Sequence, residues 1–193
     1  LWLFRMEKTL KQQSSTCVKI VLFGPESTGK TTLARQLAEH FNTLWVPEYM
    51  REYLQKKWET EGKKCTVDDL IPIAEGQMQI ENETAKRVDD LLICDTNLLE
   101  ICTYSQHYYN GFCPDEIKKY AIENTYDLYL LTYVDVPWEG DDLRDRPNER
   151  EQMFCIFEAQ LKESQLQFEL LKGSEVERFQ FAVEKIINLL KNK

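Results

Sequence analysis

Long apolar runs, paired cysteines and an excess of positive charge are all missing from this chain of 193 residues. No run approaches the roughly 18 apolar residues that a membrane-spanning helix needs, and the opening LWLFR is too short for the apolar region of a signal peptide. The six cysteines are scattered, without a C-x-x-C pair or the spacing of a zinc site, which favours reduced thiols in a reducing cytoplasm. These absences predict a soluble, cytoplasmic protein without a membrane partner.

The charge balance is acidic, because 24 Lys and Arg residues stand against 33 Asp and Glu residues, for a formal net charge of −9. Non-specific binding to nucleic acid or to an anionic membrane needs a basic surface. The sequence therefore predicts no nucleic-acid partner, and any phosphate-binding site must be a local exception to the overall field. It leaves the oligomeric state open, with a homo-oligomer possible.

Segments typical of strands alternate with segments typical of helices along the whole chain. Strands are expected at 17–23, 43–47, 91–95, 128–134 and 166–171, and helices at 30–41, 48–58, 67–88, 96–109, 114–123, 148–163 and 174–191. Thr66 followed by Asp69 is a candidate start cap for the third of these helices. Because the strands are nearly continuous apolar runs, the pattern predicts an α/β fold with a parallel sheet covered by helices on both faces.

The length of the chain fits one globular domain. We expect this domain to cover residues 17–193, after an N-terminal extension of residues 1–16. Met6 could be the natural start, in which case residues 1–5 are not native. The loop at 135–150, DVPWEGDDLRDRPNER, is too polar for the core and too long for a simple turn, so it predicts a mobile lid.

The most informative motif is GPESTGKT at residues 24–31, which matches G-x-x-x-x-G-K-[ST] and stands between an expected strand and an expected helix. Backbone N–H groups in such a loop curve round a phosphate, and the following helix directs its positive dipole end at the anion. Gly29 can take the dihedral angles of that turn, Lys30 would reach the β- and γ-phosphates, and Thr31 would offer its hydroxyl to Mg²⁺. The motif predicts ATP or GTP binding by Gly24, Pro25, Glu26, Ser27, Thr28, Gly29, Lys30, Thr31 and Thr32.

A carboxylate that completes the magnesium site is expected at the end of a neighbouring apolar strand. Asp95 ends the expected strand LLICD and meets this requirement. Since a helix is expected to begin directly afterwards, the alternative role of Asp95 is a helix N-cap, and both roles could coexist.

A second carboxylate, Glu48, follows the expected second strand and would emerge at the same edge of the sheet as the phosphate loop. Open α/β sheets bind their ligands at this edge. Glu48 could accept the proton of a hydroxyl group that attacks the γ-phosphate, with Arg51 beside it one helical turn later. The alternative is a surface ion pair between residues three apart on a helix.

The expected lid carries Arg144, Arg146 and Arg150 among several aspartates. Arginines on a mobile loop can close over the transferring phosphate and neutralise the charge that develops there. A solvated loop of mixed charge is the alternative. Trp138 either anchors the base of this loop on the core or stacks on a flat substrate ring.

The order of GPESTGKTTLA, FNT, EYMRE, DTN, PWEGDDLR and ERF resembles the ribosylnicotinamide kinase domain of NadR-type NAD-biosynthesis proteins, over roughly residues 19–190. The resemblance implies a P-loop NTPase three-layer sandwich, with a five-stranded parallel sheet and an arginine-bearing lid loop. It also implies transfer of the γ-phosphate of ATP to the 5′-hydroxyl of nicotinamide riboside. Full NadR proteins carry further adenylyltransferase and DNA-binding domains, so a stand-alone kinase domain would stop at the mononucleotide.

The resemblance also implies roles for individual residues. The residues expected to act in catalysis are Lys30, Glu48, Asp95 and Arg144. The nucleotide site would gain Arg146 and the segment 173–178, near the adenine edge, with Arg178 as its basic residue. The acceptor site would contain Glu48, Tyr49, Arg51, Asp95, Asn97 and Trp138. Thr31 and Asp95 would lie beside Mg²⁺.

The chain departs from the family pattern at three positions. Pro47 stands where the family has an aromatic residue that can stack on the nicotinamide ring, Asn97 replaces the second aspartate of DTD, and Asp142 replaces the glycine of DGLR. The first departure bears on the identity of the acceptor base, whereas the other two leave phosphoryl transfer intact.

Three functions are compatible with these residues. The first is an ATP-dependent nicotinamide riboside kinase, in which either Glu48 or Asp95 accepts the proton of the hydroxyl group. The second keeps the chemistry but uses another nucleoside or a small hydroxylated metabolite. The third is a nucleotide-dependent regulatory ATPase, which would need neither the EYMRE segment nor the lid arginines.

Overall fold

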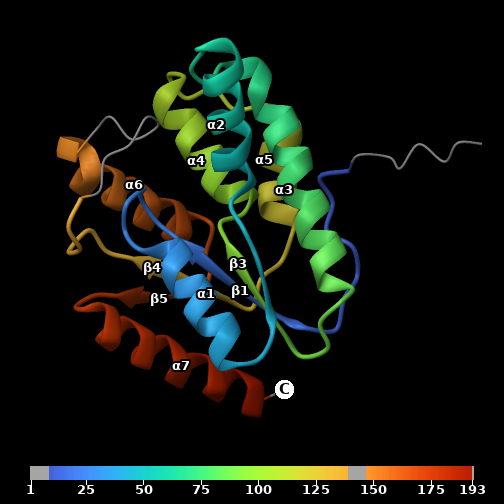
Figure 1. Cartoon of the computed structure of the whole chain (residues 1–193), viewed down its shortest axis with the longest axis vertical. Helices are drawn as coiled ribbons and strands as arrows, with labels where there is room; N and C mark the ends of the chain where they lie inside the picture. Colours follow the sequence, from blue (N-terminus) through green and yellow to red (C-terminus); the bar gives the residue numbers. More distant parts are fainter. Residues whose placement is uncertain (1–8, 139–146, 193) are drawn as a thin grey trace, which may run out of the picture.

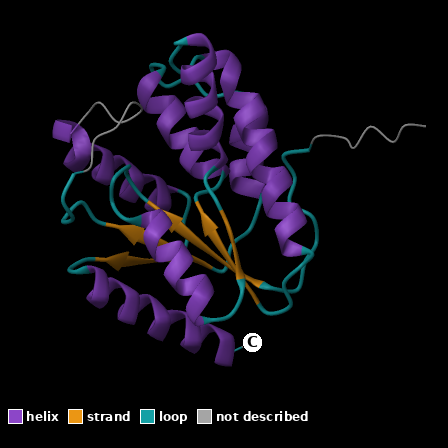
Figure 2. Ribbon diagram, viewed as in Figure 1, coloured by secondary structure: helices purple, strands orange, loops and turns teal. Residues whose placement is uncertain are grey.

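A five-stranded parallel sheet forms the centre of the molecule (Figure 2). The computed structural model describes residues 9–138 and 147–192. The strands are β1 (Val18–Phe23), β2 (Leu44–Val46), β3 (Leu91–Asp95), β4 (Leu128–Thr132) and β5 (Phe168–Leu171), in the spatial order β2-β3-β1-β4-β5. All four strand pairings are parallel. The predicted sheet is confirmed, although several strands are shorter than the apolar runs that contain them.

The helices follow the predicted order. They are α1 (Lys30–His40), α2 (Tyr49–Glu61), α3 (Leu70–Ala85), α4 (Leu98–Tyr108), α5 (Asp115–Glu123), α6 (Arg150–Glu163) and α7 (Glu175–Lys191), with short 3₁₀ turns at Val67–Asp69 and Pro147–Glu149. Thr66 and Asp69 form a capping box, but on the 3₁₀ turn that precedes α3. None of the helices in the described parts of the chain combines the length and the apolar character needed to cross a membrane.

Alternating side chains of β1 explain the three layers. Ile20 and Leu22 belong to the apolar cluster that includes Leu33 of α1 and Ile186 of α7. Their neighbours Val21 and Phe23 belong to the cluster on the opposite face, together with residues of α3, α4, α5 and α6. In Figure 1, α1 and α7 lie together, whereas α2, α3, α4 and α5 form a separate group at the other end of the molecule. The predicted α/β sandwich is therefore confirmed, while two of the three predicted lid arginines, Arg144 and Arg146, lie outside the described residues.

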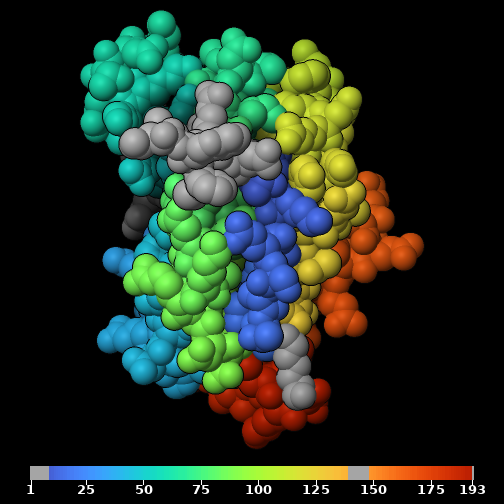
Figure 3. All heavy atoms as spheres, turned by 90° about the vertical axis from the view of Figure 1, so that its right-hand side faces the viewer, coloured from blue at the N-terminus to red at the C-terminus, as the bar shows by residue number. Residues whose placement is uncertain are grey.

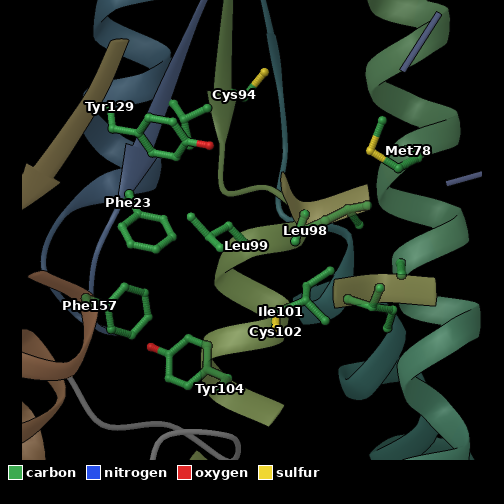
Figure 4. Close-up of a cluster of buried hydrophobic side chains, with 14 of the residues drawn as sticks. Phe23, Met78, Cys94, Leu98, Leu99, Ile101, Cys102, Tyr104, Tyr129 and Phe157 are labelled. Carbon is green, nitrogen blue, oxygen red and sulfur yellow. The ribbon is translucent and has the colours of Figure 1, made fainter. Parts of the chain in front are cut away.

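An aromatic cluster fixes α4 against the sheet and α6 (Figure 4). The ring centroid of Phe23 at the end of β1 lies 5.6 Å from that of Tyr129 and 4.8 Å from that of Phe157. Phe157 in turn meets Tyr104 of α4 at 5.1 Å. Aromatic pairs at these distances add to the hydrophobic stabilisation of a core. The cluster places α4 beside the end of β1, where the phosphate loop begins.

The N-terminal segment is part of the packed domain from residue 10 onwards. Leu10 is 1% exposed, and its carbonyl oxygen accepts a hydrogen bond from Asn124 Nδ2 at 2.9 Å. The backbone N–H of Gln12 donates to Asn124 Oδ1, and that of Gln13 donates to Asn82 Oδ1 on α3. Figure 3 shows this blue segment lying against green α3. The expected boundary between residues 16 and 17 therefore lies too late in the chain.

Candidate active site

The phosphate loop begins at a glycine that no other residue can replace without movement. Gly24 has a φ of 143°, and a Cβ atom there would lie 2.5 Å from Oγ1 and 2.9 Å from the carbonyl oxygen of Thr132 in β4. Within the loop, the hydroxyl of Thr28 donates to the carbonyl oxygen of Pro25 at 2.8 Å. The same hydroxyl lies 2.7 Å from that of Thr132, and this contact holds the loop against the end of β4.

Gly29 is needed for its conformation rather than for space. Its φ of 82° is left-handed, and no atom lies within 4 Å of the position of its missing Cβ. Gly29 is also the N-cap of α1, so the loop passes directly into the helix whose N-terminus faces the cleft. This is the geometry in which backbone N–H groups and the helix dipole favour a bound anion.

Lys30 is buried at the bottom of the cleft, where its ammonium group has three acceptors. Nζ donates to the carbonyl oxygens of Gly24 at 2.6 Å and Pro25 at 2.9 Å. It also forms an ion pair with Glu100 Oε1 at 3.2 Å. The side chain of Lys30 therefore lies along the loop with which it is predicted to bind phosphate.

Carboxylates keep this buried lysine charged. Burial by itself lowers the pKa of Lys30, but the negative charges of Glu100, Glu48 and Asp95 outweigh it, so that the pKa of Lys30 is raised. The same proximity means that three acidic side chains surround one cation. Lys30 is thus the positive charge available to a phosphate at this site, although the acidic side chains around it outnumber it.

Thr31 and Asp95 are in direct contact, as the predicted metal site requires. Thr31 Oγ1 donates to Asp95 Oδ2 at 2.6 Å, and the register pairs Asp95 of β3 with Leu22 of β1. Burial, followed by the charge of Glu48, raises the pKa of Asp95 to about 6, against the opposing effects of Lys30 and the hydrogen bond from Thr31. Asp95 Oδ1 has no hydrogen-bond partner within the described ranges. A hydroxyl and a carboxylate are oxygen ligands of the kind that Mg²⁺ prefers, so the pair fits this ion.

The N-cap of α4 is Asn97, which rules out the capping role that we considered for Asp95. Asn97 Oδ1 accepts a hydrogen bond from the backbone N–H of Glu100, and its Nδ2 donates to the hydroxyl of Tyr129 at 2.9 Å. Asn97 is fully buried and does not line the cleft. The structure thus places this predicted acceptor residue behind the site, where it holds α4 in position.

Tyr49 is also displaced from its predicted role. It begins α2, its backbone N–H donates to Gln77 Oε1 on α3, and its ring packs where α3 has Gly76 instead of a larger residue. Tyr49 does not line the cleft. It joins α2 to α3 and so supports its neighbour Glu48, which does line the cleft.

A cleft of about 840 Å³ passes over the phosphate loop at residues 26–33. One arm is bounded by residues 135–137, residues 173–175 and Arg178. The other arm is lined by residues of α2 and α4 and by residues 63–65. Glu48, the N-cap residue of α2, and Arg51 on α2 line this second arm. The cleft therefore has room for one ligand on each side of the phosphate loop.

Glu100 is the site residue that sequence reasoning missed. It lies on α4, lines the cleft and is 1% exposed. Burial raises the pKa of Glu100 to about 8, with Lys30 acting against the rise and Glu48 and Asp95 adding to it. A signal was present in the sequence, because LLEIC places one acidic residue inside an apolar stretch directly after DTN.

Arg178 lines the cleft, but its guanidinium group is bound by the protein. It donates to the carbonyl oxygens of Thr28 at 2.8 Å, Gly173 at 3.0 Å and Tyr133 at 2.9 Å, and it also pairs with Asp135. Partial burial acts against ionisation of Asp135, but hydrogen bonds from Gly173 and Arg178 lower the pKa of its carboxyl group. Arg178 therefore clamps the phosphate loop, and its contact with the nucleotide stays a prediction.

Arg150 forms a second clamp on the same loop. Its guanidinium group donates to the carbonyl oxygens of Ser27 and Val136, each at 2.9 Å. Burial and the nearby positive charge of Arg178 lower the pKa of Arg150. Its guanidinium carbon lies 5.6 Å from the ring centroid of Trp138, which supports the anchoring role of Trp138. Two other predicted site residues, Arg144 and Arg146, lie outside the described residues.

Replacing Arg178 with glutamine is expected to lower the free energy of unfolding by about 3 kcal/mol, because the buried carbonyl oxygen of Thr28 and three less buried acceptors lose their partner at once. Urea unfolding followed by circular dichroism measures this change. Arg87→Gln, at an exposed position after α3, serves as the matched control and should change the same quantity by no more than about 0.5 kcal/mol. Equal stability of the two variants would contradict the clamp.

Comparisons with known proteins agree with this architecture. A family model described as an AAA domain matches residues 19–178. The trifunctional NAD biosynthesis/regulator protein NadR of Salmonella typhimurium is 26% identical over 174 residues, which are 89% of this chain and 42% of that protein. NadR of Escherichia coli is 26% identical over 151 residues, or 77% of this chain and 37% of that protein. The chain thus spans about two fifths of the length of these relatives.

Solved structures share the fold. The crystal structure of NadR protein in complex with NR has a TM-score of 0.78 and 20% identity, covering 92% of this chain and 52% of that one. Deoxyadenosine kinase from M. mycoides, with products bound, has a TM-score of 0.65 and 15% identity, and the match covers 89% of this chain and 100% of that one. Thymidylate kinase from Ehrlichia chaffeensis has a TM-score of 0.61 and 17% identity, and the match covers 90% of this chain and 98% of that one.

Proposed function

The chain belongs to the AAA domain family, and from this premise we propose that it is an ATP-dependent kinase that phosphorylates the 5′-hydroxyl group of nicotinamide riboside, giving nicotinamide mononucleotide. One observation carries the proposal. Glu48 lines the arm of the cleft beside the phosphate loop, within the electrostatic reach of Lys30. Transfer of phosphate to a hydroxyl group requires a group that takes the hydroxyl proton next to the phosphate-binding lysine, whereas a nucleotide switch does not require one.

The residues divide the work of phosphoryl transfer between the two arms. ATP is bound by the backbone N–H groups of the loop and by Lys30, with its base toward residues 173–175. Thr31 and Asp95 would hold Mg²⁺, which when bound neutralises charge on the phosphates. The acceptor hydroxyl oxygen forms a bond to the γ-phosphorus while the bond from phosphorus to the ADP oxygen breaks. Lys30 then stabilises the charge on the transferring group.

Glu48 is the better candidate for the proton acceptor. It lines the cleft, whereas Asp95 does not line it and already receives the hydrogen bond from Thr31. A general base must be within hydrogen-bond reach of the proton that it takes. The hydroxyl proton therefore passes to the carboxylate of Glu48 as the new bond to phosphorus forms.

The choice of nicotinamide riboside is supported by the two NadR relatives and by the NadR structure in complex with NR. The chain has Pro47 where an aromatic ring could stack on nicotinamide, but tyrosines 104, 108 and 109 and Trp58 line the same arm. These rings can pack against a flat base. Another nucleoside is the second candidate, because deoxyadenosine kinase shares the fold.

A panel of nucleosides tests the proposal. The protein is incubated with ATP and Mg²⁺, and ADP formation is followed with nicotinamide riboside, with purine and pyrimidine nucleosides, and without an acceptor. We expect the largest kcat/KM with nicotinamide riboside. A preference for another nucleoside would change the substrate but keep the chemistry. Slow hydrolysis that no acceptor accelerates would favour a regulatory ATPase instead.

A further inference from the structure

Glu100 has one carboxyl oxygen that its surroundings do not satisfy. Oε1 is paired with Lys30 at 3.2 Å, whereas Oε2 has no hydrogen-bond partner among residues 9–138 and 147–192. The side chain is 1% exposed and lines the cleft between α2 and α4. Buried polar atoms of side chains nearly always have a partner, so this oxygen indicates a hydrogen-bonding group that comes from outside the chain.

The position of Glu100 is firmly determined. Asn97 caps the first turn of α4 through the backbone N–H of Glu100 itself, and Leu98, Leu99 and Ile101 are buried in the core. Tyr104, one turn later on α4, also lines the cleft, and its buried hydroxyl likewise has no partner among the described residues. The unsatisfied atoms therefore belong to a rigid wall of the acceptor arm, and they are not the result of a loosely placed side chain.

Lys30, which pairs with Glu100 in this structure, is also needed to bind the phosphates of ATP in the proposed reaction. Lys30 divides its ammonium group between Gly24, Pro25 and Glu100, but the proposed reaction requires the same group to contact the phosphates of ATP. When Lys30 turns to the phosphates, the buried carboxyl group of Glu100 needs a new hydrogen-bond partner. Because Glu100 lies beside Lys30, that partner must also lie beside the transferring phosphate. The reacting hydroxyl of the acceptor meets this requirement.

We propose that Glu100 is an acceptor-binding residue whose carboxyl group hydrogen-bonds the reacting hydroxyl group of the acceptor. This inference rests on the proposed kinase function and adds a third acidic residue to the site. Glu48 takes the proton of that hydroxyl, and Glu100 holds the hydroxyl in place. Two carboxyl groups, one at the N-cap of α2 and one on α4, then fix the direction from which the oxygen approaches the γ-phosphate.

The test measures acceptor affinity with and without the reacting hydroxyl. Calorimetric titration in the presence of a non-hydrolysable ATP analogue gives the Kd of nicotinamide riboside and of its 5′-deoxy analogue, for the wild type and for Glu100→Gln. We expect the substitution to weaken binding of the riboside about tenfold and to leave binding of the 5′-deoxy analogue within about twofold, because only the riboside has the hydroxyl that Glu100 contacts. Glu123→Gln, at an exposed position on α5, is the matched control and should change neither value.

Each other outcome has a definite meaning. An equal loss for both ligands would overturn the inference, because it would make Glu100 a structural counterion of Lys30. If Glu100→Gln lowered only the affinity for the ATP analogue, titrated by itself, the inference would be overturned in the same way. No effect on either ligand would also overturn it, and the proposed function would stand if the wild type still phosphorylates the riboside. If the wild type neither binds nor phosphorylates any nucleoside, the inference and the proposed function fail together.

Discussion

Replacing Lys30 with alanine is expected to reduce kcat by about a thousandfold or more, because preorganised charge at the transferring phosphate supplies most of the stabilisation in this chemistry. Lys30 is 8% exposed, its ammonium group lies on the phosphate loop, and three acidic residues keep it protonated. A neutral side chain leaves the γ-phosphate without its nearest protein cation. The rate of ADP formation with saturating ATP and acceptor measures the loss.

The protein should still fold after this substitution, but Glu100 loses the cation with which it is paired. Without Lys30, the carboxyl group of Glu100 stays buried beside Glu48 and Asp95. The burial and these two acidic neighbours all favour the protonated form of Glu100. The double variant Lys30→Ala with Glu100→Gln removes the remaining destabilisation and should melt close to the wild type while staying inactive. Lys86→Ala, at an exposed position after α3, is the control for losing a lysine. Activity of Lys30→Ala within about tenfold of the wild type would be too high for the role proposed.

The sequence predicted the parts of the site that depend on local order. The glycines and the lysine of GPESTGKT stand in one continuous turn, so their spacing alone determines their geometry. Asp95 reached Thr31 as expected, because the carboxyl ends of adjacent parallel strands meet at one edge of the sheet. In both cases the backbone of one or two elements is sufficient to place the side chain.

Residues whose roles depend on packing between distant segments were not predictable in this way. Glu100 looked like an ordinary acidic residue on a helix, and only the packing of α4 against the phosphate loop makes it buried. Arg178 is a clamp because α7 is packed so that its guanidinium group reaches the carbonyl oxygen of Thr28, which is 150 residues away in the chain. Leu10 is a core residue because α3 and the end of α5 enclose it.

The three acidic residues also have different positions relative to the cleft, which the sequence could not distinguish. Asp95 lies behind Thr31, whereas Glu48 and Glu100 line the arm between α2 and α4. A carboxylate that receives a hydrogen bond from the hydroxyl proposed to bind Mg²⁺ is suited to the metal, and one that faces the proposed acceptor is suited to the proton. Proximity to the phosphate loop is therefore common to all three, but their chemistry is expected to differ.

Replacing Glu48 with glutamine should lower kcat by about a hundredfold or more, because the amide cannot take the proton of the attacking hydroxyl. The amide has nearly the same shape, so the affinity for ATP is expected to stay within about twofold of that of the wild type. Single-turnover phosphorylation of nicotinamide riboside measures the chemical step directly. Glu59→Gln, at an exposed position on α2, the helix that Glu48 precedes, is the matched control and should behave as the wild type.

The companion variant Asp95→Asn decides between the two carboxylates. Asp95 contacts Thr31 and not the acceptor arm, so its loss should raise the Mg²⁺ concentration required for half-maximal activity, and added Mg²⁺ should recover much of the rate. Glu48→Gln should show no such recovery, because its defect lies in proton transfer. If excess Mg²⁺ rescued Glu48→Gln while Asp95→Asn stayed inactive at every Mg²⁺ concentration, the two roles would have to be exchanged, and the proton would pass to the residue at the end of β3.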